Sequence, residues 1–85
     1  MPIAGVVILT ESDKTEDVLI QLKKIDNITT YGIHKDNNII AVFDGESIAD
    51  LENINDRVLE NTDGVVGIYP AYVNYEENGL DEKLS

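Results

Sequence analysis

Three stretches of the chain, residues 3–9, 39–43 and 65–73, are apolar almost without a break. A β-strand with one face in water alternates apolar with polar residues. A strand that is apolar in both phases is typical of a sheet whose two faces are both covered by other protein segments. The pattern therefore predicts three strands of one sheet, and it predicts that both faces of this sheet are apolar.

Two further segments show the spacing of amphipathic helices, in which an apolar residue recurs every three or four positions. Ser12 or Asp13 is expected to cap the first helix, and Ser47, followed three residues later by Asp50, is expected to cap the second. The inner stripes consist of Val18, Leu19, Leu22 and Ile25 in the first helix and of Ile48, Leu51, Ile54 and Val58, joined in part by Leu59, in the second.

Residues 28–34 alternate loosely and predict an edge strand, which Asp36, Asn37 and Asn38 connect to the strand at 39–43 by a tight hairpin. The predicted order is strand, helix, strand, strand, helix, strand. Short connections and the handedness of crossovers turn this order into an α+β fold, the ferredoxin-like split βαβ sandwich. Its four antiparallel strands are expected in the spatial order 4-1-3-2, with both helices on one face.

Two helices of this size cover only one face of the sheet, so the other face is the candidate working surface. Side chains alternate across a strand, and the set rich in branched aliphatics is assigned to the core under the helices. This core set consists of Val6, Ile8, Ile40, Val42, Val66 and Ile68. The set that mixes small residues with large rings is assigned to the open face and consists of Ile3, Gly5, Val7, Leu9, Ile39, Ala41, Phe43, Gly67, Tyr69, Ala71 and Val73. Tyr31 fits either face.

The composition limits what can bind to this face. The 85 residues are enough for one domain, expected at 1–75, followed by an acidic and flexible tail at 76–85. Seventeen acidic residues against six basic ones give a net charge of −11, which repels nucleic acid and anionic membranes and attracts a cationic partner. The chain opens without an export signal or an apolar run long enough to span a bilayer, so we expect a cytoplasmic protein without membrane insertion.

Residues suited to catalysis or cofactor binding are scarce. His34 is the only histidine and there is no cysteine, which argues against a nucleophilic triad, and His34 is interpreted as a polar strand-end residue. The glycines are scattered singly, unlike a phosphate-binding loop, and the acidic clusters lack the ligand spacing of a calcium loop. We therefore expect a protein that is not an enzyme and that uses neither a cofactor nor a metal.

The residues alone leave two kinds of partner for the open face. A peptide that combines basic residues with an apolar stretch suits an apolar face on an acidic protein, and the n-region and h-region of an export signal peptide have this composition. Alternatively, the face is the interface of a homodimeric, small-molecule regulatory domain of the same fold, although no convergent set of polar groups marks a pocket for a metabolite. The same residues also suit a homodimer in which two sheets stack, or a surface that has no partner. A monomer or a weak homodimer is expected.

Two segments resemble a known family. The opening strand IAGVVI, at residues 3–8, is similar to the first strand of the NapD family, the assembly chaperones of periplasmic nitrate reductase. The segment GVVGIYPAYV at 64–73, followed by NYEE at 74–77, resembles that family's final strand, where a glycine-valine start leads to a tyrosine and an acidic end. Size, element order and the DGES entry to the second helix, at 44–47, agree over nearly the whole chain.

The resemblance implies a cytoplasmic chaperone that binds the twin-arginine signal peptide of a molybdoenzyme catalytic subunit, of the nitrate reductase type. By holding the peptide on its sheet surface, such a chaperone delays export until the molybdenum cofactor is loaded. With the face assignment above, this predicts a peptide-binding set of Gly5, Val7, Leu9, Tyr31, Ala41, Phe43, Gly67, Tyr69, Ala71 and Val73. Gly5 and Gly67 are expected to let the ligand approach closely. The residues expected to contact the paired arginines form an acidic rim of Asp36, Asp44, Glu76 and Glu77.

Overall fold

The computed structural model describes residues 1–74, so the expected acidic tail at 76–85 lies outside the described residues. One antiparallel sheet contains the strands β1 (Ile3–Thr10), β2 (Ile28–His34), β3 (Asn38–Asp44) and β4 (Val65–Asn74). Their spatial order, β2-β3-β1-β4, is the predicted order read from the other edge. The predicted α+β, ferredoxin-like fold is thereby confirmed.

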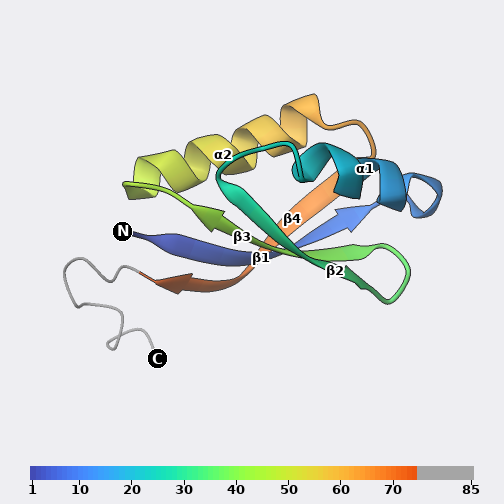
Figure 1. Cartoon of the computed structure of the whole chain (residues 1–85), viewed down its shortest axis with the longest axis horizontal. Coiled ribbons are helices and arrows are strands. Elements are labelled where there is room, and N and C mark those ends of the chain that lie inside the picture. Colours follow the sequence, from blue (N-terminus) through green and yellow to red (C-terminus); the bar gives the residue numbers. More distant parts are fainter. Residues whose placement is uncertain (75–85) are drawn as a thin grey trace.

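The two helices, α1 (Thr15–Leu22) and α2 (Ile48–Asn61), lie on the same side of the sheet (Figure 1). Helix α1 buries the stripe that the sequence predicts, whereas α2 buries only part of its stripe, because Ile48 is 39% exposed and Leu59 is 40% exposed. Each large aliphatic side chain that is buried in this way stabilises the fold by about 1.5–3 kcal/mol. The fully packed members are Val18 and Leu22 of α1 and Leu51 and Val58 of α2, with Leu19, Ile25 and Ile54 packed against them.

The two helices begin differently. Ser47 Oγ accepts a hydrogen bond from the Asp50 backbone N–H at 3.2 Å, and Asp50 Oδ2 accepts one from the Glu46 N–H at 2.9 Å. The predicted cap of α2 is therefore confirmed. The prediction for α1 is wrong, because the expected cap residues lie within a 3₁₀ turn, η1 (Ser12–Lys14), and no side chain caps α1.

Hydrogen bonds between the buried Thr10 and the half-buried Asn37 join the hairpin between β2 and β3 to the end of β1. Its turn contains Lys35 and Asp36 with φ of 53° and 70°, so the left-handed residues begin one position before the predicted Asp36. Asn37 Nδ2 donates to the Thr10 carbonyl at 2.8 Å, and the Thr10 N–H donates to the Asn37 carbonyl at 3.0 Å. The hydroxyls of Thr10 and Thr15 lie 2.7 Å apart, which links the start of α1 to the same point.

The structure reverses the predicted face of β3. The residues of β3 that lie under the helices are Ile39, Ala41 and Phe43. Phe43, 1% exposed, has the largest of the fully buried side chains, and its partner on β1 is Ala4, whose small side chain leaves room for the ring. Ile40 and Val42, which were assigned to the core, are half-buried on the opposite face. The core gains more from the phenyl ring than from either branched aliphatic side chain.

Two bulges change the alternation of side chains along β4. Pro70 and Tyr72 pair with consecutive residues of β1, so Ala71 is an extra, exposed residue between them. Beyond this bulge Val73, predicted for the open face, packs against the core instead. The second irregularity lies near the start of the strand, where Val66, predicted for the core, is 57% exposed. A strict alternation therefore describes only the middle of β4.

Candidate functional site

The face of the sheet that points away from α1 and α2 is not covered by any element of residues 1–74 (Figure 1). The strand register decides which side chains share it, because residues that oppose one another in a sheet lie on the same face. Val7, for example, lies between Ile40 of β3 and Tyr69 of β4. We call this surface the open face and define it by Ile3, Gly5, Val7, Leu9, Thr29, Tyr31, Ile40, Val42, Gly67, Tyr69 and Tyr72.

The open face combines half-buried aliphatic side chains with three exposed tyrosines. Tyr31 is 67% exposed, and Tyr69 and Tyr72 are each 55% exposed. None of the residues that define the face carries a charge. Tyrosine offers a large apolar ring with a polar tip and is enriched where proteins contact partners. Such a face can bury apolar surface of a partner while offering hydroxyl groups to it.

The two glycines of the open face have different surroundings. A Cβ on Gly67 would lie 3.0 Å from the Tyr69 hydroxyl oxygen and 3.1–3.2 Å from two ring carbons of Tyr69, so this side chain occupies the space beside Gly67. A ligand that approaches the backbone at Gly67 therefore has to displace the exposed side chain of Tyr69. A Cβ on Gly5 would lie 3.5 Å from the Cβ of Tyr72, which is ordinary contact. Gly5 thus leaves the surface low between its two strand partners, Val42 and Tyr72.

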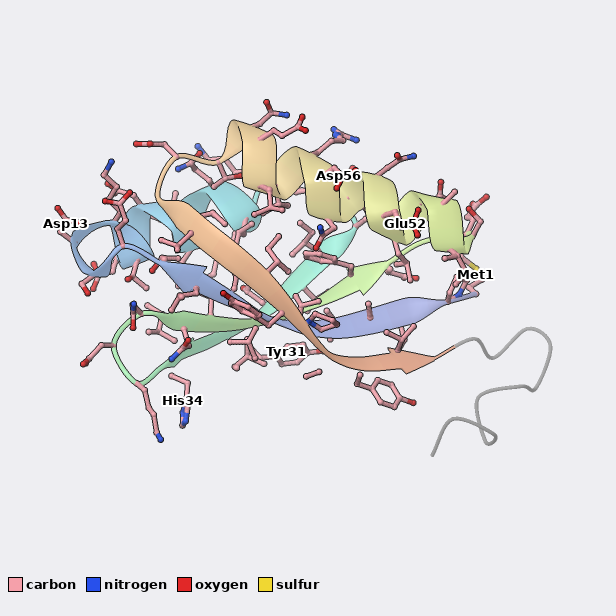
Figure 2. The ribbon with its side chains drawn as sticks, turned by 180° about the vertical axis from the view of Figure 1, so that it is seen from behind. Met1, Asp13, Tyr31, His34, Glu52 and Asp56 are labelled. Carbon is pink, nitrogen blue, oxygen red and sulfur yellow. The ribbon has the colours of Figure 1, made fainter. Side chains whose placement is uncertain are left out.

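Tyr31, whose face the sequence leaves open, lies on the open face. Figure 2 shows its ring on the side of the sheet opposite the helices. The pairing of β2 with β3 shifts between Thr30 and Ile33, and Gly32 in this bulge has a φ of 108°, a conformation that favours glycine. The bulge places Tyr31 where a bulky ligand on the neighbouring strands can reach it.

The structure places part of the predicted binding set on the open face and part elsewhere. Ala41, Phe43 and Val73 lie on the helix side, so their assignment to the open face is wrong. Ala71 is the exposed extra residue of the β4 bulge and has no partner on β1. The surface residues that sequence reasoning missed are Thr29, Ile40, Val42 and Tyr72. The residues on the open face that the prediction contained are Gly5, Val7, Leu9, Tyr31, Gly67 and Tyr69.

A signal for the correct face of β3 was present in the sequence. Asn38 and Asp44, the two polar ends of the strand, share one phase with Ile40 and Val42. When one phase of a strand has polar residues at both ends, that phase is expected to face water. For Tyr72 no such signal exists, because its face depends on a bulge that only the pairing with β1 reveals.

The two described residues of the predicted acidic rim lie far apart. Asp44 is exposed at the end of β3 and pairs with Ile3, at one end of the open face. Asp36 lies in the hairpin at the other end and lines a hollow with Asp13 on the side of α1. The intervening length of β3 is about 20 Å at about 3.4 Å per residue, too far for both to contact two adjacent arginines. Glu76 and Glu77 lie outside the described residues.

Residues 1–73 offer little to a metal or to catalysis. No three His, Asp or Glu side chains within them gather closely enough to hold a metal ion. His34 ends β2 and is exposed, as Figure 2 shows. Neither of the helices in this part of the chain has the length and hydropathy needed to cross a membrane.

Comparison with known proteins agrees with this architecture. The solution structure of the E. coli Tat proofreading chaperone protein NapD superposes with a TM-score of 0.73 at 22% sequence identity, over 91% of this chain and 81% of that one. No curated protein sequence matches the chain. The family model described as NapD protein matches residues 1–77. Because this match covers most of the 85 residues, the chain belongs to the NapD family.

Proposed function

We propose that this protein is a chaperone that binds the twin-arginine signal peptide of a molybdoenzyme precursor, of the nitrate reductase type. In this proposal the bound peptide is withheld from export until the cofactor has been loaded into the catalytic subunit. Membership of the NapD family supports a chaperone role, and the similar E. coli structure is that of a Tat proofreading chaperone. Such a chaperone acts in the cytoplasm, before export.

The observation that carries the proposal is the open face itself. Val7 and Ile40 are only half-buried, although they occupy the two central strands of the sheet, and Tyr69 and Tyr72 project beside them. Uncovered apolar residues in the middle of a small sheet are typical of a surface that a partner covers. The apolar stretch of a signal peptide supplies side chains of the required kind.

The charge of the protein selects the same class of ligand. The chain carries a net charge of −11, while the residues that define the open face are uncharged and the exposed Asp44 lies at one end of it. A ligand with positive charge at one end and an apolar stretch at the other is attracted by the whole molecule and held by the uncharged face. Export signal peptides have this arrangement, whereas nucleic acid and anionic lipid are repelled.

Titration calorimetry with a synthetic twin-arginine signal peptide tests the proposal. The double variant Tyr69→Ser/Tyr72→Ser should bind the peptide with an affinity at least about tenfold lower, because truncating an aromatic side chain in an interface commonly costs this much. Both rings are exposed, so the variant should keep the unfolding temperature of the parent within a few degrees.

Ile20→Ser is the matched control. Ile20 is also 55% exposed but lies on α1, on the other side of the molecule from the open face. This variant should bind the peptide as the parent does. Equal affinity of the parent and the tyrosine variant would refute the open face as the binding site. Sedimentation as a tight dimer that the tyrosine substitutions dissociate would favour the homodimeric regulatory domain instead.

A further inference from the structure

An apolar hollow lies on the helix side of the sheet, between α2 and the edge strand β4. Ala4, Phe43 and Val73 contribute to its floor, and Leu51 of α2 contributes to its wall. In Figure 2, β4 begins beside the C-terminal turn of α2 and then crosses obliquely away from the helix, so α2 covers the sheet less completely towards the end of β4. We call this hollow the α2–β4 groove.

The α2–β4 groove has a negative edge. Glu52 and Asp56 both line it, and their spacing of four residues puts them on the same face of α2, where Figure 2 shows them. Like charges at this spacing repel each other, and no lysine or arginine is present among the described residues that line the groove. Arg57 lines the hollow between the two helices instead. The groove thus combines an apolar floor with two carboxylates that lack a neighbouring cation within it.

The α2–β4 groove adjoins one end of the open face. Ala4 and Val73 are strand partners on the groove side, and the next pair along the same strands, Ile3 and Asn74, is the last of the sheet. Ile3 also pairs with Asp44, at the acidic end of the open face. Sheets and the layers packed on them are about 10 Å apart, which about four extended residues span. One peptide can therefore occupy the open face and continue round this end of the sheet into the groove.

We propose that the α2–β4 groove binds the arginine-bearing part of the peptide whose apolar stretch lies on the open face, an inference that rests on the function proposed above. The occupant is a segment in which an arginine stands beside a bulky apolar residue. The apolar side chain fills the floor against Val73 and Phe43, and the guanidinium donates charge-assisted hydrogen bonds to Glu52 and Asp56. The groove supplies the two neighbouring carboxylates that the separated Asp36 and Asp44 cannot supply.

A cycle of protein and peptide variants tests this inference by calorimetry. One synthetic leader carries the arginine pair, and the second carries glutamines in its place. The variant Glu52→Gln/Asp56→Asn should bind the arginine leader about tenfold more weakly than the parent, since it loses charge-assisted hydrogen bonds at a partly exposed site. It should bind the glutamine leader with the parent's affinity. This leader has no guanidinium group, so the interaction with the two carboxylates is already absent in the parent complex.

The control is Asp26→Asn/Glu60→Gln, which removes the same charge at two exposed residues away from the groove. This variant should lose less than about twofold in affinity, because distant exposed charges are screened by salt. An equal loss in both double variants, or an equal loss with both leaders, would overturn the groove as the arginine site while leaving the open face in place. A parent protein that binds neither leader would overturn both proposals together.

Discussion

The two faces of this sheet are built from similar residues but differ in what covers them. On β1, Ile8 is fully buried under the helices, whereas the adjacent Val7 is half-buried on the open face. On β3, Phe43 is 1% exposed and the adjacent Val42 is half-buried. Apolar composition therefore does not distinguish a core from a binding surface. The distinction lies in whether the chain has elements left to cover a given face.

The difference determines where each face contributes free energy. Apolar area that leaves water gains about 25 cal/mol per Å², and on the helix side this gain is already realised in folding. On the open face the same gain is realised only when a ligand covers the side chains, after the costs of association are subtracted. Substitutions on the helix side should therefore change stability, and substitutions on the open face should change binding.

The sharpest test of this contrast uses the neighbours Phe43 and Val42. Phe43→Ala should lower the free energy of unfolding by about 3–5 kcal/mol, because it opens a cavity beside Ala4. Val42→Ala should lower it by about 1 kcal/mol or less, since this side chain is only half-buried. Urea denaturation measures both values. If Phe43→Ala leaves too little folded protein, Phe43→Leu should still cost more than Val42→Ala, and equal losses would contradict the face assignment.

A second pair of variants compares glycines with similar backbone angles. Gly64 has a φ of 100° and lies under α1, where a Cβ would come within 2.8 Å of the Lys14 Cβ and 3.0 Å of a Val18 methyl group. Gly32 has a φ of 108°, but nothing lies within 4 Å of its Cβ position. Gly64→Ala should cost about 2–4 kcal/mol from strain and overpacking together.

Gly32→Ala should cost about 1–2 kcal/mol, from backbone strain alone. Thermal unfolding followed by circular dichroism compares the two. A Gly32 variant as unstable as the Gly64 variant would show that the bulge beside Tyr31 is packed rather than open. It would then contradict the expectation that substitutions on the helix side destabilise the fold more than those on the other face.

The smallest expected effect concerns an exposed ion pair that joins the helix layer to the loop before β4. Lys14 Nζ and Asp63 Oδ2 lie 3.1 Å apart, and the hydrogen bond and charge of Asp63 raise the pKa of Lys14 above its ordinary 10.5. A group whose pKa is raised by folding contributes stability below its unfolded pKa and loses it as the pH rises through the folded value.

Asp63→Asn should therefore lower the unfolding temperature slightly at neutral pH, and the difference from the parent should narrow above pH 10.5. Differential scanning calorimetry across this range gives the comparison. A large loss at neutral pH would mean that charge, rather than packing, contributes much of the stability of the helix side. A difference that widens in alkali would contradict the raised pKa of Lys14.

Much of the fold could be predicted from local patterns. The stripe of Val18 and Leu22 and the cap at Ser47 depend on residues within a few positions of one another, and these predictions are confirmed. The face of β3 is less evident, because residues 39–43 are all apolar and only the polar Asn38 and Asp44 at the ends of the strand indicate which phase faces water. The groove between α2 and β4 left no trace in the sequence, since its walls come from distant segments.

By itself the sequence determined the order of the elements, the apolar stripes of the helices and the excess of apolar strand over available cover. These follow from spacing and composition, which act locally along the chain. The tertiary structure alone decided which residues form the open face and where two carboxylates meet an apolar hollow. Pairing with β1 sets the register of β3 and the bulges of β4, and a shift of one residue in a strand moves every later side chain to the other face.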